Sequence, residues 1–395
     1  MLSRFPFLMP TFIGVCCALS VGCSSKDKAP DDAAPAQTFA ESKTSSGESV
    51  EIQTPSAATG PSKGTETQTG QASRTGKVVH LNTPDAEGDL MVYSGRSKSI
   101  MTPLLDTFEK TTGIKVSVVY NKKTIALAER IAQEGKNTEA DVFLGQDAGY
   151  IGALAKQGHL IQLPQPLLDL VASDHRDPNG FWIGTSGRAR VLVYNPSSVK
   201  KEDLPSSLEG LADPRWAKRV GWAPSNASFQ AHVSTLRKVW GEDKTKAWLT
   251  KMRGIQPQKY PKNSPQVKGV ANGEIDIGWV NHYYLHRARA TNPDIKAENY
   301  FFPEVGGAGN LLMLSGIGIT KHSKRKAKAL KLVSFLLSHE AQTHFAQKVF
   351  EYPTIADVKL HPNVPPIPPG ALAGDKAALA DVQGTVRMLR DLGLL

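Results

Sequence analysis

The sequence predicts an α/β fold with mostly parallel sheets, and three observations support this prediction. Short apolar runs of β-compatible residues recur along the chain, a stretch of helical periodicity follows most of them, and glycine or polar residues separate the two kinds of segment. Repeated strand–helix units of this kind cover the faces of parallel sheets with helices. The 395 residues suffice for one large or two medium domains with a sizeable core.

The first strand–helix unit begins at Leu90. Residues 90–93 are predicted as a strand, and the helix that follows has apolar residues on one face and ends at Thr112, because Gly113 can provide the C-cap. The further predicted strands are residues 114–120, 141–144, 191–194, 220–222, 275–280 and 314–320. The further predicted helices are residues 125–134, 148–157, 228–240, 243–253, 265–272, 324–337 and 373–392.

Residues 1–22 are predicted as a lipoprotein signal peptide. Basic Arg4 precedes an apolar run over residues 5–21, which is short for a membrane span and is followed at once by polar residues. Residues 19–23 resemble a bacterial lipobox, which implies that Cys23 is lipidated and becomes the mature N-terminus. The alternatives are plain secretion and retention of the apolar run as an anchor. All three cysteines lie within the first 23 residues, so no disulfide or thiolate metal site is expected beyond them.

Residues 23–87 are predicted as a lipidated cysteine followed by a flexible tether. The segment is rich in Ser, Thr, Gly, Ala and Pro and has almost no aromatic residues, so it buries too little apolar area to fold by itself. A coil of this length has a reach of roughly 45 Å, from about 5–6 Å times the square root of residue number. The tether would hold a folded domain, residues 88–395, clear of a membrane surface.

The positive charge of the chain lies after the tether. Residues 24–87 contain six Lys or Arg and nine Asp or Glu, so residues 88–395 carry a net charge of +12 within a total of +10 that includes Arg4. This balance favours anions. Nucleic acid is not an expected partner, because the export signal, the scattered lysines and the lack of a recognition-helix pattern argue against it. The largest basic run, residues 321–331, is interpreted as the solvent face of a helix.

Tyr283 and Tyr284 are the strongest candidates for a ligand site. They follow the apolar run 275–280, and ligands of open α/β sheets bind at the carboxyl ends of strands. Adjacent residues of a strand point to opposite faces, so both phenols can meet one ligand only if the strand ends before them. A phenolate is a hard oxygen donor, and hard, highly charged cations prefer oxygen. The alternative is that the two tyrosines simply begin a buried helix.

Several segments, in the same order, resemble those of periplasmic ferric-ion-binding proteins, the iron receptors of ABC importers. They are VYSGR (92–96), LLDTFEKTTGIKV (104–116), ADVFLGQDAG (140–149), GRARVLVYNP (187–196), WAPSNASFQ (222–230), NHYYLHR (281–287) and EYP (351–353). The resemblance covers almost all of residues 88–395. It implies a two-lobed periplasmic-binding-protein fold, or Venus flytrap, in which each lobe is a mainly parallel sheet flanked by helices. Lobe 1 is expected at about 88–187 and 312–364, and lobe 2 at about 188–311 and 365–395.

The resemblance also implies a ferric site. Tyr283 and Tyr284 match the family's paired tyrosine ligands, and a loop at a helix start matches the segment that holds a synergistic anion. The residues expected at the anion are Ser225, Asn226, Ala227, Ser228, Asn263 and Asn281, with Arg188 or Arg190 facing it from the other lobe. The chemistry agrees, since Asn226 is a good N-cap and free amides at a helix start form an anion site. The alternative is a helix cap without a ligand.

Two departures point away from a phosphate-type site. Some family members have a ligand histidine in the first loop and a ligand glutamate after the DVF strand, where this chain has Ser97 and Gln146. Other members use tyrosines with carbonate, anchored by an arginine in the first loop, and Arg96 suits that role. These members usually add a third tyrosine near the helix start at Asn226, which this chain lacks. The site then has two protein ligands or uses a further one from Tyr150, His282 or His286.

The sequence therefore predicts an exported, lipid-anchored binding protein that captures iron(III) with two tyrosinates and a synergistic anion, with carbonate as the expected anion. The resemblance implies a monomer that delivers iron to the ABC permease of the inner membrane. Catalysis is not expected, because no nucleophile elbow, HExxH motif or triad spacing occurs. Two alternatives remain: a related receptor for an anionic organic solute such as a phosphonate, and an exported enzyme on a similar fold.

Overall fold

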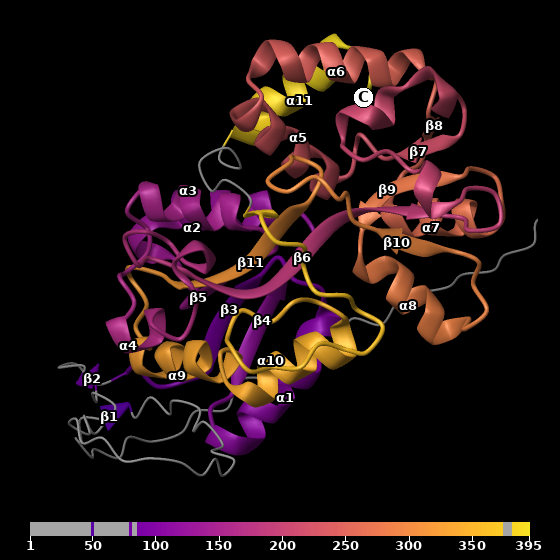
Figure 1. The fold of residues 1–395 in the computed structure, drawn as a ribbon. Coiled ribbons are helices and arrows are strands. Elements are labelled where there is room, and N and C mark those ends of the chain that lie inside the picture. The colour runs from indigo at the N-terminus through magenta and orange to yellow at the C-terminus, as the bar shows by residue number, and fades with distance from the viewer. Residues whose placement is uncertain (1–48, 51–78, 81–84, 374–380) are drawn as a thin grey trace, which may run out of the picture. The chain divides into compact units, whose positions relative to one another are not determined.

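The computed structural model describes residues 49–50, 79–80, 85–373 and 381–395 (Figure 1). The predicted signal peptide, Cys23 and most of the predicted tether lie outside the described residues. Two short strands lie within the tether, where β1 (Ser49–Val50) pairs antiparallel with β2 (Val79–His80). In the described part of the chain, no helix has the length and apolar character that a membrane crossing requires.

A ten-stranded mixed sheet is the framework of the folded part (Figure 1). The strand order is β4-β3-β5-β11-β6-β9-β7-β8, with β10 beside β6 and β12 beside β11. The strands are β3 (Leu90–Ser94), β4 (Val116–Tyr120), β5 (Val142–Gly145), β6 (Ile183–Tyr194), β7 (Val220–Trp222), β8 (Gln258–Lys259), β9 (Ile277–Asn281), β10 (Glu298–Tyr300), β11 (Leu311–Ile319) and β12 (Leu372–Ala373). Pairing is parallel toward both ends of the sheet and antiparallel between the central strands β5, β11, β6 and β9.

The long strand β6 joins the two halves of the sheet. It pairs with β11 as far as Ala189 and with β9 from Arg190 onward. Every residue of β6 is buried, although only its apolar end, residues 191–194, was predicted as a strand. Ser186, Arg188 and Arg190 interrupt the apolar pattern, and because side chains alternate along a strand, these three share one face. The polar residues that concealed the strand in the sequence are the ones that this face presents to the candidate site.

The helices are α1 (Lys98–Thr112), α2 (Thr124–Glu134), α3 (Ala148–Lys156), α4 (Gln165–Leu168), α5 (Ala227–Val239), α6 (Glu242–Gly254), α7 (Asn263–Ala271), α8 (Tyr283–Thr291), α9 (Lys326–Leu336), α10 (His339–His344) and α11 (Val382–Asp391). The predicted helices occur in the predicted order, and the structure adds α4, α8 and α10, which were not among them. Helix α1 ends at Gly113, whose φ of 71° is left-handed. The predicted helix 373–392 is wrong at its start, because Ala373 pairs in β12. Helix α11 begins after Asp381, whose side chain accepts a hydrogen bond from the Gly384 amide at 2.9 Å.

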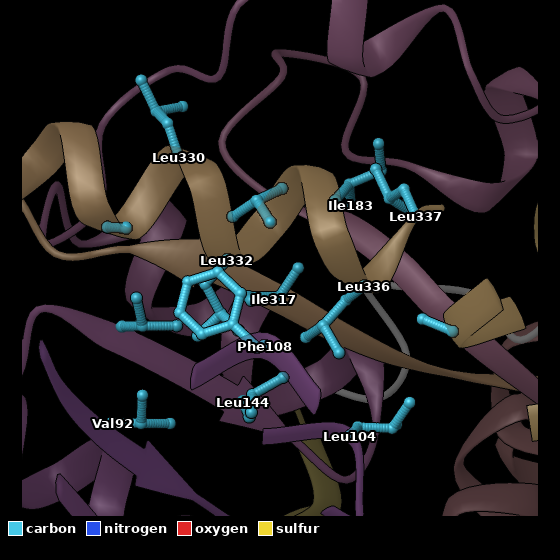
Figure 2. Close-up of a cluster of buried hydrophobic side chains, with 14 of the residues drawn as sticks. Val92, Leu104, Phe108, Leu144, Ile183, Ile317, Leu330, Leu332, Leu336 and Leu337 are labelled. Carbon is cyan, nitrogen blue, oxygen red and sulfur yellow. The ribbon is translucent and has the colours of Figure 1, made fainter. Parts of the chain in front are cut away.

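Each half of the sheet has a core on both of its faces. In the half that contains β3 and β5, one core packs against α1 and α9, where Figure 2 shows Phe108 close to Ile317 and Leu332. The next residues along the same strands, such as Tyr93 and Phe143, face the opposite core under α2 and α3. In the other half, one core packs against α5, α6 and α11. The core on the opposite face packs against α7 and α8. A sheet covered by helices on both faces explains why its strands are apolar almost throughout.

Asp85 caps a helix that lies more than two hundred residues further along the chain. Its carboxylate accepts hydrogen bonds from the backbone amides of Ala327 at 2.9 Å and Lys328 at 2.7 Å, at the start of α9. The guanidinium of Arg325 donates to the carbonyl of Glu87 at 2.9 Å. These contacts satisfy amides that a helix start leaves without intrahelical partners. Residues 85–87, which the sequence assigned to the tether, are therefore held against α9.

Candidate metal and anion site

Tyr283 and Tyr284 stand side by side at the start of α8. Strand β9 ends at Asn281, and the next residue already has helical backbone angles, so the two phenols do not diverge as they would in a strand. Their rings are stacked, with centroids 4.3 Å apart and planes 29° from parallel. Tyr283 is 5% exposed, whereas Tyr284 is half-buried. The strand therefore ends before the two tyrosines, which is the condition for both phenols to meet one ligand.

Burial and the nearby guanidinium act in opposite directions on the pKa of Tyr283. Burial raises the pKa of the Tyr283 hydroxyl well above its ordinary value, the adjacent Tyr284 raises that pKa further, and the guanidinium of Arg188 lowers it. Without a metal, Tyr283 is therefore a neutral phenol at neutral pH. A trivalent cation bound at the phenolic oxygens would favour the charged form of the phenols and displace their protons.

Arg190 is a buried cation at the centre of the predicted anion residues. One terminal nitrogen, Nη1, donates to Asn281 Oδ1 at 3.1 Å, Asn263 Oδ1 at 3.3 Å and Ser228 Oγ at 3.4 Å. The other, Nη2, donates to the Trp279 carbonyl at 2.9 Å, and the guanidinium lies 4.9 Å from the Trp279 ring centroid. These partners are all neutral. Burial lowers the pKa of Arg190 to about 9, which the two tyrosines oppose. A buried charge with neutral partners is costly and favours a nearby anion.

The helix start at Asn226 is capped by its own side chain. Asn226 Oδ1 accepts from the Ser228 amide at 3.1 Å and from Ser228 Oγ at 2.6 Å. Ser225 and Ala227 are exposed, while Asn226 and Ser228 are half-buried. Asn263 donates to the same Asn226 oxygen at 3.4 Å. The cap that the sequence offered as the simpler alternative is present, and it holds Ser228 next to Arg190.

Arg96 is already paired with a carboxylate. Its Nη2 lies 2.7 Å from Glu351 Oε2, and its Nη1 donates to Ser315 Oγ at 2.9 Å. Ser186 Oγ also donates to Glu351 Oε2, at 2.6 Å, and the Arg96 and Glu351 side chains are each only 1% exposed. Burial alone would raise the pKa of Glu351, but the guanidiniums of Arg96 and Arg188 and the hydrogen bonds from Arg96 and Ser186 outweigh it, so the pKa lies below its ordinary value. The two arms of the Arg96 fork are therefore in use.

The predicted anion residues thus form two groups along one face of β6. Arg190 gathers Ser228, Asn263 and Asn281 at one end, and the Arg96–Glu351 pair contacts Ser186 at the other. Arg188 lies between them and donates to the Gln146 carbonyl. The charge partner Glu351 was missed in the sequence, where its only signal was its place in the segment EYP.

The three candidates for a further ligand are placed differently. Both ring nitrogens of His282 have backbone partners, the Ala189 amide at 3.1 Å and the Phe350 carbonyl at 2.7 Å. His286 Nε2 lies 3.2 Å from the side-chain amide of Asn299. Tyr150 lies on α3, where burial and then Asp147 raise its pKa to about 12. Within residues 85–373 and 381–395, no cluster of three or more His, Cys, Asp and Glu side chains could hold a metal.

Comparisons by family, by sequence and by structure all find binding or iron-uptake proteins of bacteria. Residues 137–372 match a family of bacterial extracellular solute-binding proteins. Over 291 residues, the chain is 34% identical to iron uptake protein A1 of Synechocystis sp.. This alignment covers 72% of this chain and 80% of that protein. It is 32% identical to the major ferric iron-binding protein of Neisseria meningitidis over 71% of this chain and 86% of that protein. The structure of iron-bound HitA from Pseudomonas aeruginosa superimposes with a TM-score of 0.71 at 31% identity, covering 78% of this chain and 99% of that one.

Proposed function

Because the chain belongs to the bacterial extracellular solute-binding proteins, and among them to the ferric-ion-binding proteins, we propose that it captures ferric ion outside the cytoplasm for an ABC importer. Its relatives are binding proteins, so its role is binding and not catalysis. The observation that carries the ferric proposal is the stacked pair Tyr283 and Tyr284, next to the buried guanidinium of Arg190. The two-lobed fold is that of these relatives. We propose the lobes at about 88–187 with 312–364 and at about 188–311 with 365–395, and the change of β6 from β11 to β9 after Ala189 supports a division near this point.

The charges of the site favour ferric ion with an anion. Two phenolates leave one positive charge on a trivalent ion, and phenolate oxygens are hard donors suited to it. The guanidiniums of Arg188 and Arg190 interact favourably with the deprotonated phenols and with an anion that completes the coordination. Protons compete for the phenolates, so iron is held less tightly as the pH falls.

A ferric titration of the iron-free protein tests this function. Ferric-phenolate charge transfer absorbs visible light, so one equivalent of ferric ion, supplied as a weak chelate, is expected to give a reddish protein with a saturable band. A protein that stays colourless and leaves the iron with the chelator would contradict the ferric proposal. Binding of a phosphonate by the same colourless sample would then support the alternative of an organic-anion receptor.

The anion is expected to be carbonate bound near Arg190. Ferric affinity should rise when bicarbonate is added to a bicarbonate-free sample. Arg190→Lys should reduce that dependence by about tenfold, because lysine does not reproduce the planar guanidinium, whose partners in the structure are all neutral. Arg96→Lys should reduce it less, since the Arg96 fork already binds Glu351 and Ser315. Arg215→Lys, at an exposed site, is the matched control. If affinity does not change when bicarbonate is excluded, the carbonate proposal fails.

We also propose that the protein is anchored by lipid at Cys23 and works as a monomer with the inner-membrane permease of its importer. The support is the lipobox-like segment at residues 19–23 and the tether that follows it. Cys23→Ser in the full chain is expected to move the protein from the membrane fraction to the soluble fraction without loss of ferric binding. A variant that fractionates with membranes like the wild type would show that the apolar run itself is the anchor.

A further inference from the structure

His282 lies fully buried between the end of β9 and the first turn of α8. The backbone amide of Ala189 donates to its Nδ1 at 3.1 Å, so Nδ1 is the nitrogen without a proton. Its Nε2 therefore carries the proton and donates to the Phe350 carbonyl at 2.7 Å. With one nitrogen accepting and the other donating, the neutral ring has no position left for a metal.

The backbone of His282 is held at the same place as its ring. Its amide donates to the Ala189 carbonyl at 3.0 Å, and its carbonyl accepts from the Asn299 side chain at 2.9 Å. The ring packs against Tyr352, with centroids 4.7 Å apart, and meets the Tyr283 ring edge-on at 5.8 Å. Residue and ring are thus fixed from several directions immediately before the paired phenols.

The two hydrogen-bond partners of the His282 ring, Ala189 and Phe350, each lie next to a charged residue of the site. Ala189 is the residue at which β6 stops pairing with β11, one position before Arg190. Phe350 precedes Glu351, the buried partner of Arg96, and Tyr352, whose amide donates to the Gly187 carbonyl at 2.8 Å. The imidazole therefore links the start of α8 to the strand that carries Arg188 and Arg190 and to the segment that carries Glu351.

We infer that His282 is a positioning residue for the ferric site, and not an iron ligand. It orients the first turn of α8 so that both phenols face the guanidiniums of β6. This inference rests on the proposed ferric function. Removing the ring leaves the Ala189 amide and the Phe350 carbonyl buried without these partners, which loosens the helix start. Loss of such an outer-shell partner usually weakens metal binding by about 10–100-fold without removing a ligand.

Three substitutions separate the two hydrogen bonds. His282→Phe removes both, His282→Asn keeps an acceptor near the position of Nδ1, and His282→Gln keeps a donor near the position of Nε2. In the full chain, His282→Phe is expected to lower ferric affinity about 10–100-fold and to shift the visible band, with Asn and Gln giving smaller losses. His175→Phe is the matched control, because His175 also lies near a carbonyl of this segment, that of Thr354 at 3.5 Å, but is remote in sequence from the phenols.

A second measurement, amide hydrogen exchange, tests whether His282 holds the start of α8 in place when no iron is bound. In the iron-free protein, hydrogen exchange at the Ala189 amide and in the first turn of α8 is expected to be at least about tenfold faster in His282→Phe than in the wild type. The inference would be overturned if His282→Phe kept wild-type ferric affinity and an unshifted band. It would also be overturned if all three variants lost affinity equally, because that is the result expected for an iron ligand. If the wild type itself takes up no ferric ion, the proposed function fails, and faster exchange would still show the positioning of α8.

Discussion

Tyr283→Phe and Tyr284→Phe are each expected to lower ferric affinity by more than about 100-fold, and the double variant should lose the visible band altogether. Each substitution removes one phenolic oxygen and leaves the stacked rings in place. The loss should exceed the roughly 10–100-fold effect of an outer-shell partner, because each substitution removes a direct ligand of the proposed site. Ferric titration followed by visible absorbance measures both quantities, and circular dichroism checks that the fold is intact.

Tyr300→Phe is the control for the tyrosine variants. Tyr300 is buried in another core and donates from its hydroxyl to the Pro205 carbonyl at 3.2 Å, away from the phenol pair. It should bind ferric ion like the wild type. A double variant of Tyr283 and Tyr284 that retains ferric affinity would refute the tyrosinate site. Loss of stability without loss of binding would instead indicate that the two rings serve packing alone.

Glu351→Gln is expected to lower the free energy of unfolding by about 3–5 kcal/mol at pH 7. The substitution keeps the shape of the side chain but leaves the buried Arg96 guanidinium without its counter-charge, which is the costly way to break a buried ion pair. Urea unfolding of the iron-free protein measures the effect. Adding Arg96→Met to this variant should recover part of the loss, because the double variant no longer buries an isolated charge.

The same pair predicts a dependence of stability on pH. The pKa of Glu351 is lower in the folded protein than its ordinary value, so its stabilising contribution is complete above the unfolded-state pKa of about 4.3. That contribution is lost as the pH falls through the lower folded-state pKa. The difference between wild type and Glu351→Gln should therefore shrink as samples are taken from pH 7 toward pH 3. Glu340→Gln, at an exposed site on α10, should change stability little at either pH. A difference that stays constant with pH would show that charge is not the cause.

Strand and helix order could be read from the sequence because each half of the sheet is covered on both faces. Strands such as β9 are then continuous apolar runs. Helices such as α1 have a single apolar face, and α1 ends at the C-cap Gly113. Prediction failed where function or the sheet edge interrupts the pattern. The first part of β6 contains Ser186, Arg188 and Arg190, and the short strand β12 at Leu372–Ala373 has no pattern of its own.

The sequence by itself determined that this protein is an α/β binding protein of a recognisable family, and that two phenols follow a buried strand at the edge where ligands bind. Only the tertiary structure decided the partners of the buried charges. It pairs Arg96 with Glu351, 255 positions away, and it surrounds Arg190 with neutral side chains. It also gave both nitrogens of His282 to the backbone of distant segments. The physical reason is that periodicity and caps are local properties of the chain. The partner of a buried charge or ring nitrogen depends on which distant segments the sheet brings together, and no local pattern records that choice.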